Sequence, residues 1–272
     1  MNKPGFLIDM DGVVYKGSQP IPGALDFIDF LKAAGFPFLF LTNNSQRTNR
    51  DVCYKLQRMG FDVQDEDIFT CGMATAKYLA SRKESGTAYV IGEGGLLTEL
   101  HSIGYSIVDE SPDYVIIGEG RTIMLESVDK AINMVMNGAK LIATNMDPNC
   151  PVGNGKFRAG CGAFVSMIEC ATGKKAFSVG KPSPVMMRMA RKKLDLSTDE
   201  TIMIGDTMST DILGAGTMGF TTVLTLSGVT KKEDLDQFSY APDFVIDSIK
   251  DLLEPGFFQD VIRKKKGYNS FV

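Results

Sequence analysis

The sequence is poor in the residues from which many catalytic and metal centres are built. Its single histidine, His101, excludes zinc sites that need clustered histidines, such as His-Glu-x-x-His. It also lacks a Gly-x-Ser-x-Gly nucleophile turn and a Gly-x-x-x-x-Gly-Lys-Ser/Thr phosphate loop. Any hydrolytic chemistry in this protein would therefore have to depend on carboxylates.

Cysteine usage, apolar runs and charge limit the compartment and the partners. The five cysteines are odd in number and form no Cys-x-x-Cys pair, which is typical of reduced thiols in a cytoplasmic protein. No apolar run reaches the roughly 18 residues that a membrane helix needs, and Asp9 interrupts the first apolar run. The net charge of -4 gives no indication of the basic surface that binds polymeric nucleic acid. We expect a partner that is neither a membrane nor a nucleic acid.

Short apolar runs alternate with helix-like segments at both ends of the chain. Runs that are apolar on both faces suit a parallel sheet covered by helices on each side. The expected strands are 6–8, 36–41, 201–205, 221–226 and 243–246, and the expected helices are 24–34, 49–59, 184–194 and 210–218. The pattern predicts an α/β fold with a doubly wound sheet.

The middle of the chain predicts a second α/β unit. Its expected strands are 87–92, 114–118 and 140–144, and its expected helices are 96–103, 125–137 and 162–172. Two packed modules are typical of this chain length. We expect a core made of residues 1–72 and 178–272, with residues 73–177 inserted as a second domain. The Gly-, Pro- and Asn-rich segment 147–160 is expected to be a loop.

Carboxylates follow directly after two of the apolar runs. Asp9 and Asp11 follow the first run, and Asp206 follows the third, with Asp211 five residues further on. In open α/β sheets, ligands bind at the carboxyl ends of the strands. Several buried carboxylates repel one another unless a cation neutralises them, and oxygen ligands favour Mg²⁺. The pattern therefore indicates a Mg²⁺ site, whereas a single Asp would read as an ordinary turn residue.

Four motifs in order resemble those of the haloacid dehalogenase (HAD) superfamily. Asp9-Met10-Asp11-Gly12-Val13-Val14 resembles its first motif. The other three motifs are similar to Leu41-Thr42-Asn43-Asn44, Gly180-Lys181-Pro182 and the segment from Ile204 to Ile212. Segments 71–76, 142–147 and 160–163 further resemble the NagD-type subfamily, which carries a large α/β cap between the second and third motifs. The resemblance implies that residues 73–177 form this cap.

The resemblance implies a phosphatase that works through a phospho-aspartyl intermediate. Asp9 would be the nucleophile. Asp11, two residues on, would protonate the departing ester oxygen and then take a proton from the attacking water. Mg²⁺ would be held by Asp9, Asp11 and Asp206, while Asp211 would orient the ligands or a metal-bound water.

The remaining motif residues are expected to hold the phosphate. Thr42 offers a hydroxyl and Asn43 a backbone or amide donor to the phosphoryl oxygens. Lys181 supplies a positive charge to the phosphate and to Asp9. In the inserted unit, Asn145, Asp147 and Arg158 lie in or beside the polar loop. They are expected either to read the leaving group or to be solvated loop residues.

Several alternatives stay open at this point. Nucleoside monophosphates are the first expectation for the substrate, and phosphoglycolate, sugar phosphates and pyridoxal phosphate are the alternatives. Other HAD reactions are a dehalogenase, a phosphonatase and a phosphomutase. A phospho-acceptor domain would be much shorter, and a non-catalytic binding module would not need the complete set of acids and lysine. The oligomeric state is left open.

Overall fold

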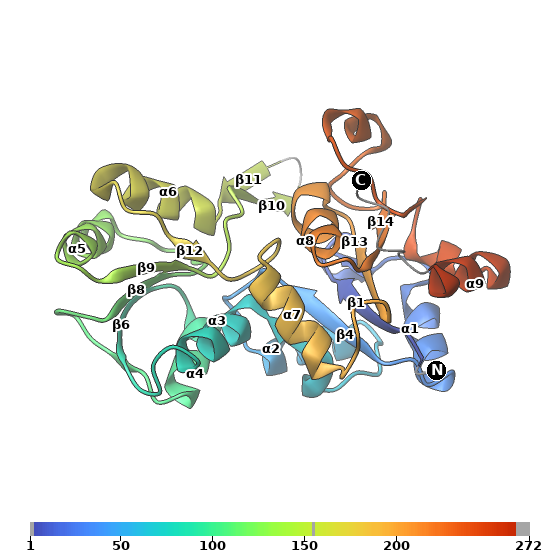
Figure 1. The fold of residues 1–272 in the computed structure, drawn as a ribbon, viewed down its shortest axis with the longest axis horizontal. Coiled ribbons are helices and arrows are strands. Elements are labelled where there is room, and N and C mark those ends of the chain that lie inside the picture. The colour runs from blue at the N-terminus through green and yellow to red at the C-terminus, as the bar shows by residue number, and fades with distance from the viewer. Residues whose placement is uncertain (1–2, 154–155, 265–272) are drawn as a thin grey trace. The chain divides into compact units, whose positions relative to one another are not determined.

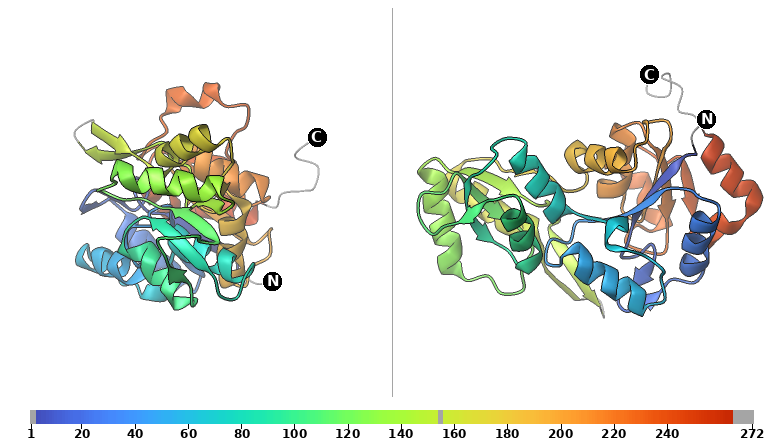
Figure 2. Two further views of the ribbon diagram at one scale, coloured as in Figure 1. Left: turned by 90° about the vertical axis from the view of Figure 1, so that its left-hand side faces the viewer. Right: turned by 90° about the horizontal axis from the view of Figure 1, so that it is seen from below.

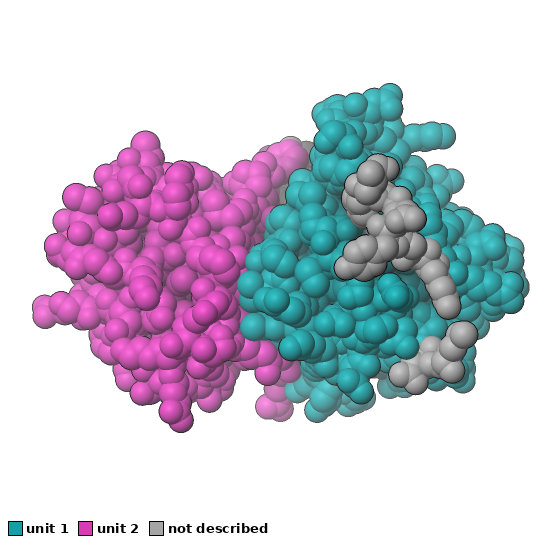
Figure 3. Space-filling model, viewed as in Figure 1, with its two compact units in different colours: residues 1–41, 52–69, 181–272 teal, residues 42–51, 70–180 magenta. Residues whose placement is uncertain are grey.

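The computed structural model describes residues 3–153 and 156–264, and the chain divides into two compact units. Unit 1 contains residues 1–41, 52–69 and 181–272, and unit 2 contains residues 42–51 and 70–180 (Figure 3). Each unit is built on its own parallel sheet with helices beside it, so the predicted α/β fold is confirmed. The exact limits of the cap, 73–177, stay a prediction.

Helices and strands alternate along most of the chain (Figure 1). The strands are β1 Gly5–Asp9, β2 Tyr15–Lys16, β3 Gln19–Pro20, β4 Phe38–Thr42, β5 Ile68–Thr70, β6 Thr87–Ile91, β7 Ser106–Ile107, β8 Tyr114–Ile117, β9 Lys140–Ala143, β10 Asn149–Gly153, β11 Lys156–Ala159, β12 Phe177–Ser178, β13 Thr201–Gly205, β14 Thr221–Thr225 and β15 Phe244–Ile246. The α-helices are α1 Ala24–Ala33, α2 Asn49–Arg58, α3 Cys71–Ala80, α4 Gly94–Ser102, α5 Leu125–Met136, α6 Cys161–Thr172, α7 Pro184–Lys193, α8 Leu213–Thr217 and α9 Pro255–Arg263.

The sheet of unit 1 has six strands in the order β15-β14-β13-β1-β4-β5. Strand β1 lies between β13 and β4 and pairs in parallel with both, Gly5 opposite Thr201 and Asp9 opposite Leu41. The order runs outward from β1 in both directions, so the topological switch point lies beside it. Because the carboxyl ends of parallel strands share one edge, the residues that follow β1, β4 and β13 leave the sheet on the same side.

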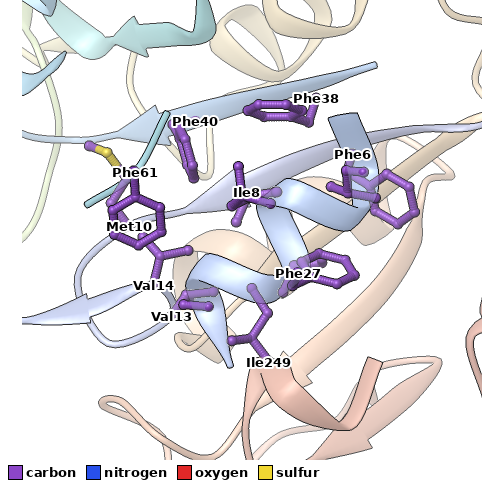
Figure 4. Close-up of a cluster of buried hydrophobic side chains, with 14 of the residues drawn as sticks. Phe6, Ile8, Met10, Val13, Val14, Phe27, Phe38, Phe40, Phe61 and Ile249 are labelled. Atoms are coloured by element: carbon purple, nitrogen blue, oxygen red, sulfur yellow. The ribbon is translucent and has the colours of Figure 1, made fainter. Parts of the chain in front are cut away.

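One face of this sheet is covered by a core rich in phenylalanine. Phe6 and Ile8 of β1 point into it beside Phe27 of α1 and residues of α2 and α9 (Figure 4). The ring of Phe6 meets Phe27 edge-on at 6.0 Å and stacks on Phe258 at 5.8 Å between centroids. Burying each such side chain stabilises the fold by about 1.5–3 kcal/mol. This core fixes β1, and with it the position of Asp9.

Unit 2 contains a five-stranded parallel sheet in the order β12-β9-β8-β6-β7. Helices α5 and α6 pack on one face of this sheet (Figure 2). Val128 of α5 and Val165 of α6 belong to one buried cluster with Val115 and Ile117 of β8. Helices α3 and α4 pack against each other. The alternating apolar runs and helices of the middle segment therefore form the second α/β layer structure that the sequence predicted.

Two local predictions differ from the structure. The segment 147–160, expected to be a loop, contains the antiparallel hairpin β10–β11, with a bulge between Pro151 and Gly153. Residues 154–155 of this segment lie outside the described residues. The helix expected over 210–218 begins earlier, with a π-helical turn at Met208–Ile212 that continues into α8. The hairpin is held by backbone pairing such as Asn149 with Ala159, and the π-helical turn by the Ile212 N–H, which donates to Thr207 O at 3.3 Å. None of the helices of the described chain is long and apolar enough to pass through a bilayer.

Candidate active site

Three carboxylates meet at the edge of the unit 1 sheet. Asp9 ends β1, Asp206 directly follows β13, and Asp211 lies in the π-helical turn. One carboxylate oxygen of each lies within 4.8 Å of the others. Asp206 and Asp211 are almost wholly buried, and the side chain of Asp9 is 13% exposed. The structure thus brings together three of the four predicted acids. Asp211 lies within the group itself, whereas the sequence analysis expected it to orient the metal ligands or a metal-bound water.

Lys181 supplies the one positive charge in contact with this group among the described residues. Its ammonium donates a hydrogen bond to Asp9 Oδ1 and another to Asp211 Oδ1, at 2.7 Å. The side chain is 4% exposed. Burial alone would lower the pKa of Lys181, but the charges of Asp211 and Asp9 outweigh it and raise that pKa. Lys181 is therefore a fixed cation, in the place expected for a residue that holds phosphate and the nucleophile.

The acids retain an excess of negative charge. Burial raises the pKa of Asp9 well above its usual value, and Asp211 and Asp206 raise it further against the opposing charge of Lys181. Burial and Asp211 raise the pKa of Asp206 to about 6. Three buried carboxylates with one lysine carry uncompensated charge, which a divalent cation would neutralise. The donor set of hard oxygens fits Mg²⁺.

A backbone amide and a hydroxyl bind the Asp206 carboxylate, and two glycines leave room for it. The sequence analysis identified Gly12 of the first motif but not Gly228. The Val229 N–H donates to Asp206 Oδ2 at 2.7 Å, and Thr207 Oγ1 donates to Oδ1 at 3.0 Å. A Cβ added at Gly228, or at Gly12 with its φ of +87°, would overlap Asp206 Oδ2. The sequence shows Gly228 only as a residue of the loop after β14, and no local pattern marks its approach to Asp206.

Replacement of Gly228 by alanine should displace the carboxylate of Asp206 and impair activity. Because the added methyl group overlaps Asp206 Oδ2, we expect Mg²⁺ affinity to fall about 10–100-fold, the usual cost of losing a group that orients a metal ligand. Titration of activity with Mg²⁺ measures this. Gly216→Ala is the matched control, since no atom lies within 4 Å of a Cβ there. Equal Mg²⁺ dependence of the two variants would contradict the role given to Gly228.

Asp11 occupies a different place from the three clustered acids. In the part of the chain that the structure describes, the group of acids comprises Asp9, Asp206 and Asp211 and does not include Asp11. Asp11 is exposed and lies in a tight turn in which the Gly12 N–H donates to Tyr15 O at 2.8 Å. Desolvation by the surrounding protein raises its pKa, against the charges of Lys55 and Lys16. A carboxyl with a raised pKa is suited to donate a proton.

Thr42, Asn43 and the predicted specificity residues belong to unit 2. Thr42 ends β4, where its Oγ1 accepts from the Asn44 N–H at 3.0 Å. The side-chain amide of Asn43 donates to Asp147 Oδ2 at 3.1 Å. Asn145 donates to Asn43 O at 2.7 Å and accepts from the Asp147 N–H at 3.0 Å. Asn145 is fully buried, so its amide braces the segment after β4, and Asp147 is the more accessible of the two.

Arg158 contacts other residues of unit 2. On β11, it pairs with the buried carboxylate of Glu119 at 3.3 Å and donates to Gly120 O at 3.2 Å. The Glu119 N–H in turn donates to Ser45 Oγ at 2.9 Å. No sequence pattern indicated this pair, because its members lie 39 positions apart in the chain. The pair ties the hairpin β10–β11 to the sheet of unit 2.

Comparison with known proteins agrees with this geometry. A family model for haloacid dehalogenase-like hydrolases matches residues 6–106, and a second HAD-hydrolase-like model matches residues 178–252. Dihydroxyacetone phosphatase of Corynebacterium glutamicum is 41% identical, over 92% of this chain and 90% of that protein. Ribonucleotide monophosphatase NagD of Escherichia coli K12 is 39% identical, over 93% and 99%.

Solved structures give the same result. The structure of NagD from E. coli K-12 has a TM-score of 0.85 at 38% identity, covering 92% of this chain and 98% of NagD. That of p-nitrophenyl phosphatase from Archaeoglobus fulgidus has a TM-score of 0.87 at 35% identity, covering 93% and 99%. The chain therefore belongs to the haloacid dehalogenase (HAD) superfamily of hydrolases. Within that superfamily it is a phosphatase of the NagD type, as its motifs indicated.

Proposed function

We propose that the protein is a Mg²⁺-dependent phosphatase that hydrolyses small phosphate monoesters through a phosphorylated Asp9. The observation that carries the proposal is the buried group of Asp9, Asp206 and Asp211 with Lys181 bound to two of its members. It combines a nucleophile, an oxygen donor set for a divalent cation and a fixed positive charge. A binding module would have no need of so costly a concentration of buried charge.

The reaction follows from the roles of these residues. A carboxylate oxygen of Asp9 attacks phosphorus while the bond from phosphorus to the ester oxygen breaks, and Asp11 gives its proton to that oxygen. Water then attacks the phosphorus of phospho-Asp9, Asp11 takes a proton from it, and inorganic phosphate leaves. Lys181 holds the phosphate and Asp9 together throughout, and Thr42 and Asn43 donate to the phosphoryl oxygens.

Asp206 and Asp9 would hold the Mg²⁺, with Asp211 beside them. The Asp11 carboxylate, which lies outside this group, is left for proton transfer. When bound, Mg²⁺ neutralises part of the repulsion between the Asp9 carboxylate and the phosphate dianion.

Nucleoside monophosphates are the substrate class we put first. Support comes from the relatives, one of which is a ribonucleotide monophosphatase and another a 5'-nucleotidase. Dihydroxyacetone phosphatase and acid sugar phosphatases are also among the relatives, so triose and sugar phosphates are the second class. Phosphoglycolate and pyridoxal phosphate are the remaining candidates. Asn145 and Asp147 are proposed as the specificity element, with Asp147 in contact with substrate and Asn145 in support. The free thiols of all five cysteines agree with a cytoplasmic place of action.

Phosphate release from a panel of monoesters tests this function. The panel contains nucleoside monophosphates, dihydroxyacetone phosphate, sugar phosphates, phosphoglycolate, pyridoxal phosphate and nitrophenyl phosphate, each assayed with Mg²⁺ and with excess chelator. We expect turnover that needs Mg²⁺ and is highest for a nucleotide. Full activity in chelator would refute the metal requirement. A sugar phosphate at the head of the ranking would move the substrate to the second class.

A further inference from the structure

Lys55 has an unusual position for a lysine on a surface helix. It lies on α2, and its Nζ is 3.7 Å from the centroid of the Tyr15 ring. Tyr15 is 7% exposed and Lys55 is half-buried, so the charge lies over an aromatic face in partly dehydrated surroundings. A cation in that place is attracted by the ring, but it has given up part of its hydration. A nearby negative charge would therefore stabilise the Lys55 ammonium further.

The ring under Lys55 belongs to the turn that carries Asp11. Tyr15 forms a bridge with Asp11, and its carbonyl accepts from the Gly12 N–H at 2.8 Å. Ser227 Oγ donates to Gly12 O at 2.7 Å and ties the same turn to the loop after β14. Hydrogen bonds at both the N–H and the C=O of Gly12 therefore hold the turn, and a shift of the Tyr15 ring would move Asp11 with it.

Asp11 is also the acid whose charge acts on Lys55. Burial lowers the pKa of Lys55, and the negative charge of Asp11 opposes that effect. Asp51, one helical turn before Lys55, is engaged by the hydroxyl of Thr48 at 2.9 Å. None of the ion pairs found among the described residues includes Lys55. The charge of Lys55 is thus left to act at short range on the turn.

We infer that Lys55 is a positioning residue for Asp11, acting through the ring of Tyr15 and through its charge to keep the Asp11 carboxylate at the departing ester oxygen. The inference rests on the proposed function, in which Asp11 protonates that oxygen. It adds to the site a residue from α2, which none of the four sequence motifs contains.

Leaving-group dependence tests the inference. Lys55→Met and Lys55→Gln remove the charge, Lys55→Arg keeps it, and Arg58→Met is the matched control. Arg58 lies on the same helix, 6.0 Å from the ring of the exposed Tyr54. Each variant is assayed with nitrophenyl phosphate, which leaves without a proton, and with the alkyl phosphate that the unaltered enzyme hydrolyses best.

A neutral residue at position 55 should impair the alkyl ester selectively. General acids contribute about 10²–10⁴-fold. We therefore expect a misplaced Asp11 to cost about tenfold in kcat/KM with the alkyl ester and less than about twofold in kcat/KM with nitrophenyl phosphate. The comparison uses kcat/KM because kcat also includes hydrolysis of phospho-Asp9, in which Asp11 acts on both substrates alike. Lys55→Arg should recover most of the loss, and Arg58→Met should match the unaltered enzyme. An equal loss on both substrates, or no loss with either neutral variant, overturns the inference.

The proposed function fails by a different result. If Asp9→Asn were active, the phospho-aspartate mechanism would be wrong. If Asp9→Asn is inactive and both neutral Lys55 variants behave like the unaltered enzyme, the mechanism stands and only the role of Lys55 is lost.

Discussion

Asp9→Asn should abolish hydrolysis of alkyl and nitrophenyl phosphates alike. The amide cannot attack phosphorus, so both esters lose the same first step, and we expect a fall in kcat of at least about 10⁴-fold. The fold should persist, because β1 is fixed by the phenylalanine core on its other residues. Loss of one of the repelling charges around Asp9 should even ease its burial.

Asp11→Asn should instead separate the two substrates. An alkyl oxygen needs a proton as its bond to phosphorus breaks, whereas nitrophenolate needs almost none. We expect a loss of about 10²–10⁴-fold with alkyl esters and a much smaller effect on phosphoryl transfer from nitrophenyl phosphate. Since the attacking water also loses its base, phosphate should accumulate on Asp9.

Mass spectrometry of quenched reactions follows both variants. The Asp11→Asn protein should gain the mass of one phosphoryl group after mixing with nitrophenyl phosphate, and the double variant with Asp9→Asn should not. Near-normal turnover by Asp9→Asn, or a phosphoryl group on another residue, would show that the proposed chemistry is wrong.

Asp206→Asn should remove most of the response to Mg²⁺. Asp206 follows the strand next to β1 and accepts hydrogen bonds from the Val229 N–H and the Thr207 hydroxyl. The oxygen of an Asn can still accept from Val229, and its NH2 can donate to the Thr207 hydroxyl instead, but the negatively charged metal ligand is lost. Metal binding supplies several kcal/mol to the transition state. Because each 1.4 kcal/mol is tenfold in rate, we expect a loss on the order of 10²-fold or more at a fixed Mg²⁺ concentration.

The same substitution should not lower the thermal stability of the protein, although it lowers the activity. Burial and Asp211 raise the pKa of Asp206 to about 6. A group with a raised pKa stabilises the fold while protonated, and that contribution is lost as the pH rises through about 6. In chelator at pH 8, Asp206→Asn should therefore melt at the same or a higher temperature than the unaltered protein. Added Mg²⁺ should stabilise only the unaltered protein.

A second sheet carboxylate provides the control. Asp243 precedes β15 and accepts from Thr222 N–H and Oγ1, at 2.9 and 3.0 Å, remote in sequence from the motifs. Asp243→Asn should lower the melting temperature and leave the Mg²⁺ dependence of activity unchanged. If Asp206→Asn responds to Mg²⁺ as Asp243→Asn does, Asp206 is not a metal ligand.

The parts of the fold that the sequence predicted are those set by local pattern. The strands β1, β13 and β14 are almost entirely buried, and each was predicted to within about two residues, the usual precision of such boundaries. Asp9 ends β1 and Asp206 directly follows β13, so their approach could also be anticipated, with Asp211 expected in support five residues further on. The hairpin β10–β11 could not, because its strands read as a polar, glycine-rich turn segment and pair only with each other.

The supporting residues of the site escaped prediction for a related reason. Gly228 and Lys55 are common residues in ordinary positions, and only the folded chain places one against Asp206 and the other over Tyr15. Asn145 was expected either to read the leaving group or to be a solvated loop residue, and it is buried in contact with Asn43. Such roles depend on contacts between residues that are distant in sequence, which no local pattern records. Asn145 and Asn43, for example, lie more than 100 positions apart in the chain.

The order of strands in unit 1 also has a consequence for synthesis on the ribosome. Strand β1 carries Asp9 and is made before the other strands of its sheet. Strand β4 can join it early, but β13 on its other side is made only after all of unit 2. A nascent chain that ends before Thr201 has half a sheet, with the hydrogen-bonding edge of β1 open to other chains until β13 arrives. Asp9 is therefore synthesised before unit 2, and Asp206 and Asp211 after it. Unit 2 can fold on its own sheet while the sheet of unit 1 is still incomplete. Stalled or truncated products would be inactive and prone to associate through β1.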